Sequence, residues 1–469
     1  MFSKSERTVP HTELNTAHSF HSTLVFPFNF TMSFPTLSVY KDLIASYPTW
    51  PAFRTHLTGA LKLRVEDYSL PDSPYAIIRY VKGQTDMSNP IARAFRSVVW
   101  DTIAHRPVSV TSWKSADGEG LPDTPLRDSS GVAQFSVEPF VDGTLIGLFW
   151  DSYSGRWRIH TRSILDARCR YYSSHKTFSD MFWSAFRATD LSTLNRAFSY
   201  SYILRHPENR IVCAVTSPCA VLADVCAVDA DSNVAWQPHV SAPLPQMADW
   251  AAVRTALADF NTRFAHNYMG FVVKSSDGRR WKLRTPEYNR VRALRGNSPR
   301  RDYMWLKYWR DGTLRNYLAL YSEERRDADA LIARWKAATG DVYHIYCDVF
   351  KARSMDRKAI PPKYRPLVYN LHSLYLETLK PANKTVDWKA CLAHMNTKDV
   401  AQMLYVLNWE HRLAAKDLGT TAIPLEPPSK LGTTVDTKAE TESDEVVADK
   451  TPADAPTVVD NAASTTTSA

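Results

Sequence analysis

The stretch 136–150, SVEPFVDGTLIGLFW, decides the fold of this chain. Two apolar runs, 135–140 and 144–150, meet here at a turn that contains Asp142 and Gly143. Short runs rich in β-branched and aromatic residues, bounded by turn residues, are typical of buried strands. The sequence therefore predicts two consecutive strands with a carboxylate at the turn between them.

Similar patterns extend this prediction in both directions along the chain. Further strands are expected at 75–80, 97–100, 107–110, 156–161, 200–204, 211–215, 221–228, 271–274 and 280–283. Helical spacing of apolar residues predicts one or two short helices within 36–66, and helices at 178–194 and 249–264. After Pro286 the strand signals fade, and helices are predicted at 302–322, 324–338, 342–352, 365–380, 385–394 and 398–409.

The predicted fold class is therefore α+β, with an antiparallel β-core followed by an all-helical region. We expect four segments: a loose N-terminal arm at 1–35, a core at 36–297, a helical domain at 298–412 and a disordered acidic tail at 413–469. The tail is rich in Thr, Ala, Asp, Glu and Ser and lacks a periodic apolar face, which is typical of disorder.

Charge and cysteine spacing narrow the class of protein. The net charge is +8, but the residues from Lys430 onward hold eight acids and three lysines, so 1–429 carry +13. A basic body suits a polyanion partner, although the excess charge could serve solubility alone. The six cysteines form no zinc-ligand spacing, and no apolar run reaches the length of a membrane helix. We expect reduced thiols in a cytoplasmic, intracellular protein without a resident metal.

Several strings that accompany the first stretch occur in a characteristic order along the chain. They are ARAFRSVVWD at 92–101, WRIHTRSILDA at 157–167, YSYILRHPENRIV at 200–212, MGFVVK at 269–274 and WKLRTPEY at 281–288. Together with FVDG at 140–143, this series resembles the nucleotidyltransferase motifs of the phage T4 ligase 1 type of RNA ligase. The helical region resembles that of ligase-like proteins encoded by large DNA viruses.

The resemblance implies an antiparallel, ATP-grasp-like nucleotidyltransferase core and, if the protein is active, the use of ATP and Mg²⁺. In this family the lysine of the first motif attacks the α-phosphate of ATP and becomes covalently adenylylated. Phe140 stands in its place here. Ile203 and Met269 stand where the family has carboxylates, and neither side chain can bind a hard cation. The resemblance thus predicts a pocket in which the covalent step is lost.

Other positions of the motifs keep their polar residue types. The resemblance assigns nucleotide binding to Asp142, Gly143, Arg162, Lys282 and Arg284. In the family the pair at 282 and 284 neutralises phosphate charge, and arginine keeps the positive charge at the second position. An ordinary solvated basic face is the alternative interpretation of this pair.

A displaced nucleophile is an alternative to the loss of activity. Lys114 precedes Asp117 and Gly118 with a spacing one residue longer than the motif requires. Such a lysine would have to enter the same pocket and lose its proton there. A loop lysine near the mouth of the pocket is the simpler interpretation.

The segment 274–310 holds twelve Lys or Arg residues against three acids, and aromatic residues are interleaved with them. Basic side chains neutralise a nucleic-acid backbone, and exposed aromatic rings stack on bases. We expect RNA contacts at Arg279, Arg280, Arg290, Arg292 and Arg295, although many of the aromatic residues could belong to the core.

Three functions follow from these observations. The first is an RNA ligase-like pseudoenzyme that binds RNA, single-stranded or nicked, or ATP, or both. The second is an active ATP-dependent RNA ligase that uses a displaced lysine such as Lys114. The third is a non-catalytic scaffold for a protein partner.

Overall fold

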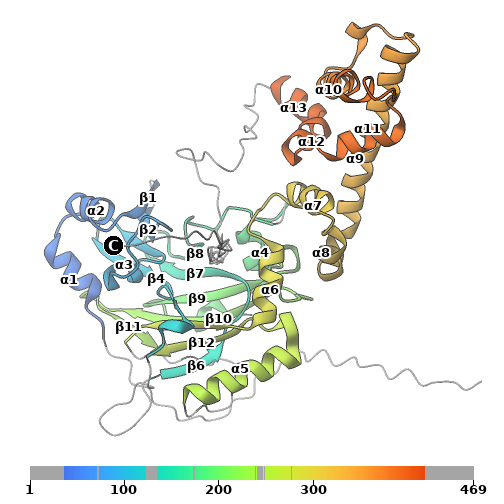
Figure 1. The fold of residues 1–469 in the computed structure, drawn as a ribbon. Coiled ribbons are helices and arrows are strands. Elements are labelled where there is room, and N and C mark those ends of the chain that lie inside the picture. The colour runs from blue at the N-terminus through green and yellow to red at the C-terminus, as the bar shows by residue number, and fades with distance from the viewer. Residues whose placement is uncertain are drawn as a thin grey trace, which may run out of the picture. The chain divides into compact units, whose positions relative to one another are not determined.

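Three β-sheets build the first part of the described chain (Figure 1). The computed structural model describes residues 36–417, except 71–72, 123–134, 173–174, 188, 238, 240–243, 245–246, 248 and 276. The N-terminal arm predicted at 1–35, and the predicted tail beyond residue 417, lie outside the described residues.

Each sheet is formed by strands that pair in a simple order. Sheet 1 has the order β1-β2-β3-β4, with bounds Leu63–Leu70, Ser73–Tyr80, Val98–Asp101 and Arg106–Val110. Sheet 2 has the order β11-β10-β9-β7-β8, with bounds Val234–Gln237, Cys219–Val228, Phe198–Arg205, Thr144–Asp151 and Arg156–His160. Sheet 3 has the order β5-β13-β12-β6, with bounds Ala116–Asp117, Arg280–Arg284, Gly270–Ser275 and Phe135–Pro139. All pairings are antiparallel except that of β5 with β13.

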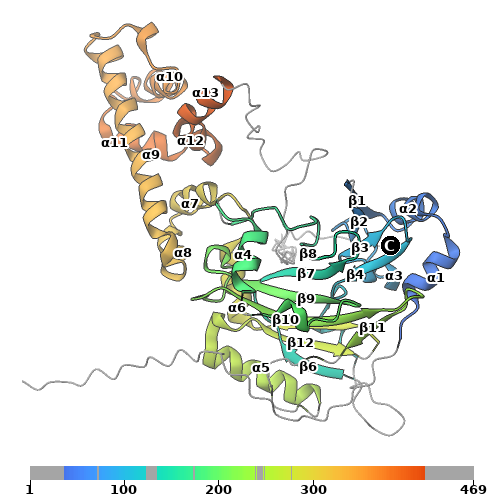
Figure 2. The same cartoon turned by 180° about the vertical axis from the view of Figure 1, so that it is seen from behind.

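Helices cover the outer faces of these sheets, because each sheet must bury its apolar side chains. Helices α1 (Val39–Ser46) and α2 (Trp50–Gly59) pack with sheet 1 around Trp100. Helix α4 (Phe178–Ala185) covers sheet 2, and α5 (Trp250–Phe264) lies along sheet 3 beside β6 and β12. Both views show sheet 2 layered against sheet 3 (Figure 2).

The remaining described chain is helical. Its helices are α6 (Pro286–Arg295), α7 (Arg301–Arg310), α8 (Leu314–Leu320), α9 (Arg325–Tyr346), α10 (Arg365–Leu374), α11 (Trp388–Asn396), α12 (Val400–Leu407) and α13 (Trp409–Asp417). The short α3 (Pro90–Ala94) precedes β3. No helix in the described part of the chain is long and apolar enough to cross a membrane.

The predicted α+β class is confirmed, and one predicted strand is wrong. Residues 211–215 do not form a strand, because the backbone N–H groups of Val212 and Cys213 donate to the carboxylate of Asp142 instead of to a neighbouring strand. The helix predicted over 178–194 ends at Ala185, and the two helices predicted between 324 and 352 are joined into α9. The domain boundaries stay a prediction.

Candidate functional site

A cavity of about 120 Å³ lies between sheets 2 and 3. Its walls come from six strands of these sheets and from neighbouring loop segments. The lining residues are Arg96, Ser112, Ser115, Glu138, Pro139, Phe140, Val141, Leu145, Ile203, Val221, Leu222, Ala223, Val272, Lys274 and Arg280. The cavity is therefore apolar on the side of sheet 2 and carries charged groups on the side of sheet 3.

Strand alternation explains which side chains of sheet 3 reach the cavity. Successive side chains of a strand point to opposite faces, so Glu138 and Phe140 share one face. Glu138 pairs with Val272 across the ladder, and Lys274 pairs with Arg280. The other face of these strands, with Phe271 and its neighbours, packs under α5.

Phe140 faces this cavity, where the resemblance expects a nucleophilic lysine. Its backbone N–H donates to the carbonyl oxygen of Gly270 at 2.8 Å, which continues the β6–β12 ladder by one residue. The guanidinium carbon of Arg284 lies 5.5 Å from the centre of the Phe140 ring, a cation–π contact. The aromatic ring is thus fixed between the two sheets, with a cation over it.

Only two of the three apolar replacements meet in the cavity. Ile203 of β9 lines it together with Phe140. Met269 does not line the cavity: its side chain is buried with Tyr288 and residues of the C-terminal helices, in a cluster against which Phe140 also packs. The three apolar positions therefore do not line one cavity, and the loss of the covalent step stays a prediction.

Asp142 is buried and its carboxylate is fully used within the fold. One oxygen, Oδ2, accepts from the backbone N–H groups of Val212 and Cys213 at 2.9 and 2.8 Å. The other oxygen, Oδ1, accepts from the Tyr288 hydroxyl at 2.7 Å. Burial and this carboxylate raise the pKa of Tyr288 well above its ordinary value. Asp142 therefore joins the motif-one turn to the 211–213 segment and to α6.

Gly143 is required by a close approach of two strands. A Cβ at this position would lie 2.5 Å from the carbonyl oxygen of Leu204 and 2.6 Å from Cγ2 of Ile203. Such distances are shorter than van der Waals contact, so any larger residue would push β7 away from β9. The structure thus gives both residues of the Asp-Gly turn a packing role, and their binding to a nucleotide stays a prediction.

A network of buried and half-buried charges links sheet 3 to β10 of sheet 2 beside the cavity. The ammonium group of Lys274 lies 2.7 Å from Oε2 of Glu138, 2.9 Å from Oδ1 of Asp224 and 2.7 Å from the carbonyl oxygen of Ala223. A guanidinium nitrogen of Arg280 lies 3.4 Å from Oδ2 of Asp224. Because an ammonium group has three donors, Lys274 has one acceptor for each of them.

This network stabilises the ionised carboxylates. Burial would raise the pKa of Asp224, but Arg280 and Lys274 outweigh it and hold that pKa well below its ordinary value. Burial also opposes ionisation of Glu138, and the imidazole of His239 with the ammonium of Lys274 lowers its pKa. Both carboxylates are therefore charged at neutral pH and partner cations of the same protein.

The cationic residues predicted to act on or bind a nucleotide do not all lie at one site. Lys114 and Arg162 meet over one ring: the Lys114 ammonium lies 5.8 Å and the Arg162 guanidinium carbon 4.6 Å from the centre of Tyr80. Neither residue lines the cavity. Lys282 is buried on β13 and lies 3.4 Å from the carboxylate of Asp117. Nucleotide binding by Arg162 and Lys282 therefore remains a prediction.

The five arginines expected to contact RNA also differ in their surroundings. Arg279 and Arg290 reach the surface, and each forms an ion pair with a carboxylate of its own element, Asp277 and Glu287. Arg280 faces the cavity, as described above. Arg292 lies in a largely buried position on α6, and Arg295 is buried and paired with Glu324. The basic segment is thus not one exposed face, and RNA contact by these residues stays a prediction.

The donor set of the cavity does not fit a divalent cation. No group of three or more His, Cys, Asp or Glu side chains in the described residues is placed to hold a metal ion. Glu138 and Asp224, the carboxylates nearest the cavity, already partner Lys274 and Arg280. A hard cation such as Mg²⁺ prefers several oxygen ligands, which this arrangement does not offer.

Sequence analysis missed the residues of this charge network. Two signals pointed to them. Glu138 stands two residues before Phe140, so it shares the same strand face, and Asp224 interrupts an apolar strand, VLADVCAV, where a charge needs a partner. Lys274 supplies that partner from a residue distant in sequence, and only the tertiary structure shows the pairing.

Comparison with known proteins supports the resemblance to RNA ligases. No family model matches the chain. The RNA ligase of Rhodothermus phage RM378 is 29% identical over 104 residues, which are 20% of this chain and 23% of the phage protein. The chain therefore matches about a quarter of the length of this relative. The resemblance to RNA ligases is confirmed at the level of sequence.

Two solved structures of archaeal ATP-dependent RNA ligase overlap with this structure. Form 2 is 13% identical, with a TM-score of 0.31, and the overlap covers 64% of this chain and 82% of the archaeal chain. Form 1 is 12% identical, with a TM-score of 0.30, over 79% and 98% of the two chains. Neither overlap is close enough to transfer a site to this chain.

Proposed function

We propose that this protein is an RNA ligase-like pseudoenzyme, which binds RNA or nucleotide and does not form a covalent lysyl-AMP intermediate. The position of Phe140 carries the proposal. Its ring lines the cavity between sheets 2 and 3 and is covered by the guanidinium of Arg284. A phenyl ring has no lone pair with which to attack a phosphate.

The lysine that lines the cavity does not replace the missing nucleophile. The ammonium group of Lys274 contacts three acceptors: the carboxylates of Glu138 and Asp224 and the carbonyl oxygen of Ala223. Each of its three donors already has an acceptor within the fold, so the amine is engaged in holding sheets 2 and 3 together. The charge network thus supports a structural role for Lys274.

The displaced-nucleophile alternative names Lys114, which lies near Tyr80 and Arg162. No contact of Lys114 with the cavity favours this alternative. The alternative nevertheless predicts a distinct result, a covalent label on Lys114, and the experiment below separates it from the pseudoenzyme.

The test is incubation with α-labelled ATP and Mg²⁺ or Mn²⁺, followed by acid precipitation. We expect no label bound to the precipitated protein for the wild type or for Phe140→Met, a matched variant of similar volume without an amine. Phe140→Lys restores the amine, and label on that variant alone would support both ligase ancestry and loss of the covalent step. Label on the wild type, mapped by peptide sequencing to Lys114 or to any other lysine, contradicts the proposal.

RNA binding is the second part of the proposal and separates it from a protein scaffold. Binding of RNA that weakens as salt is added supports it, because each neutralised phosphate releases counterions. Failure of the wild type to bind RNA or nucleotide at low salt would favour the scaffold. We further propose an intracellular location, which includes the interior of a virus-infected cell, and the six unpaired cysteines are compatible with it.

A further inference from the structure

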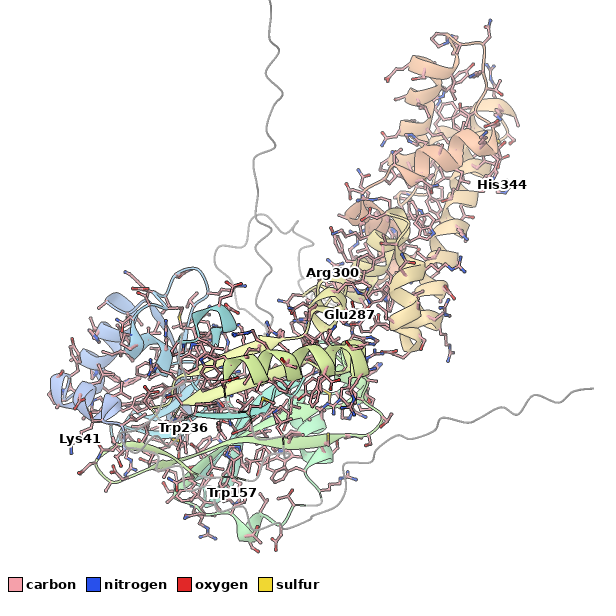
Figure 3. All side chains as sticks on the ribbon, turned by 60° about the horizontal axis from the view of Figure 1, so that its bottom comes forward. Lys41, Trp157, Trp236, Glu287, Arg300 and His344 are labelled. Atoms are coloured by element: carbon pink, nitrogen blue, oxygen red, sulfur yellow. The ribbon has the colours of Figure 1, made fainter. Side chains whose placement is uncertain are left out.

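Trp150 and Trp157 form a cross-strand aromatic pair at one end of sheet 2. They are directly opposite in the β7–β8 register, and their ring centres lie 5.6 Å apart at an interplanar angle of 75°. Both side chains are only half-buried, whereas α4 covers the rest of this face of the sheet. Trp157 lies near the outer margin of the core (Figure 3).

An exposed arginine stacks on this pair. The guanidinium carbon of Arg196 lies 4.0 Å from the centre of the Trp150 ring, which is a close cation–π contact. Tyr200 extends the aromatic row, with its ring centre 5.9 Å from that of Trp157 and an interplanar angle of 67°. No parallel ring therefore stacks on Trp157 from either of these neighbours.

The cation of this surface lacks a carboxylate partner. Arg196 is exposed and forms no ion pair within the part of the chain that the structure describes. Asp151, the acid at the end of β7, is buried and bound by Arg158, Tyr75 and Ser154. The positive charge of this surface is thus available to an external anion, unlike that of Arg279 and Arg290.

We propose that Trp150, Trp157 and Arg196 form a binding platform for single-stranded RNA. A half-exposed tryptophan stacks on a base of any sequence, and an adjacent arginine contacts a flanking phosphate. A guanidinium stacked on an indole keeps its N–H edge directed outward, which suits bidentate contact with a phosphate. The choice of RNA rests on the proposed function, whereas the site itself rests on the charges and rings of this surface.

The platform differs from the RNA surface expected from the sequence, which lies in the segment 274–310. Three arginines of that segment are exposed, and each is paired with a carboxylate: Arg279 with Asp277, Arg290 with Glu287 and Arg310 with Asp311. An arginine that must first leave a carboxylate gains less from a phosphate than one without a partner. The two surfaces can therefore be compared directly by mutation.

The test is a filter-binding titration of the full chain with a short fluorescent oligo(A) RNA at several salt concentrations. Trp157→Ala removes one stacking ring, so we expect affinity to fall about 5- to 100-fold, and Trp157→Phe should retain most of it. Arg196→Ala should weaken binding and reduce the salt slope by about 0.7, the value for one phosphate of a single strand. Arg196→Lys should keep the salt slope but not the full affinity.

The double variant Lys41→Ala with Arg54→Ala is the matched control, since it removes two exposed cations that are already paired, with Asp231 and Asp67. We expect its affinity to stay within about threefold of the wild type. Thermal unfolding of each variant confirms that the fold is kept. Arg196→Ala is the decisive variant if Trp157→Ala unfolds, because the Arg196 side chain is exposed.

The outcomes separate this inference from the proposed function. If the wild type binds the RNA and both Trp157→Ala and Arg196→Ala bind with unchanged affinity and salt slope, the platform is wrong and RNA binding stands. If the fully paired duplex of the same sequence binds as tightly and responds equally to Trp157→Ala, stacking on single strands is wrong. If the wild type binds no RNA, the platform and the RNA-binding part of the proposed function both fail.

Discussion

The cavity between sheets 2 and 3 and the Trp150–Trp157 platform place similar residue types in opposite situations. In the cavity, Lys274 and Arg280 are buried and bind Glu138 and Asp224. At the platform, Arg196 is exposed and contacts an aromatic ring. Burial explains the difference, since a charge removed from water requires a partner and a solvated charge does not. A count of basic residues therefore does not indicate where a polyanion binds.

The largest effect is expected from breaking the buried network. Lys274→Met leaves Glu138 and Asp224 with one fewer cation in a buried site, and we expect the free energy of unfolding to fall by about 3–5 kcal/mol. Urea unfolding followed by circular dichroism measures this loss. Arg279→Met, on the same hairpin but exposed, should change stability by less than about 0.5 kcal/mol.

A double variant checks the cause of that loss. Lys274→Met combined with Glu138→Met removes one unpaired carboxylate, so it should be more stable than Lys274→Met alone. An equal or greater loss in the double variant would mean that packing, and not charge, makes Lys274 necessary. The contrast between the cavity and the platform would then lose its physical basis.

The buried side chain of His160 makes the stability of the fold depend on pH. Burial lowers the pKa of His160 to about 4. The unfolded chain, with a histidine pKa of about 6.5, takes up this proton first, so stability is full above that pH and falls between it and about 4. We expect this residue to remove about 3 kcal/mol of stability between pH 7 and pH 4. Urea titrations across that range measure it.

The difference between wild type and His160→Gln isolates this contribution. The variant should lose less stability than the wild type between pH 6.5 and pH 4. Protonation of Glu138 and Asp224 at low pH lowers the stability of both proteins equally. His411→Gln, at an exposed position, should follow the wild-type profile. Identical slopes for the wild type and His160→Gln would contradict the prediction.

The smallest effect concerns the cations beside Phe140. Lys282→Ala with Arg284→Ala removes the Arg284 guanidinium from the ring and the Lys282 partner of Asp117. We expect RNA or nucleotide affinity to fall by about 1–3 kcal/mol, the scale of lost charge-assisted hydrogen bonds. Filter binding measures this change. Unchanged affinity would mean that Lys282 and Arg284 have only a structural role. A loss greater than that of Arg196→Ala would mean that the cavity, and not the platform, is the main binding site.

Some errors of the sequence analysis have clear causes. The strand predicted at 211–215 has a suitable apolar pattern, but two of its backbone N–H groups donate to the carboxylate of Asp142 and not to a neighbouring strand. Helix α6 was missed because its composition is basic, although its N-terminal signals were present: Thr285 caps the helix through Tyr288 N–H, and Pro286 follows at the first position. Local pattern thus misled where a tertiary hydrogen bond or a cap decided the conformation.

The sequence by itself determined the α+β class, most strands of the three sheets, the RNA ligase resemblance and the presence of phenylalanine at position 140. These features depend on local periodicity and on residue identity, and both can be read directly from the sequence. Only the tertiary structure decided that Phe140 and Ile203 share a cavity that Met269 does not line, and that Lys274 pairs with carboxylates of two other strands. The tertiary structure also shows which exposed arginines form ion pairs within the described part of the chain and which do not, because these partners depend on the folded arrangement.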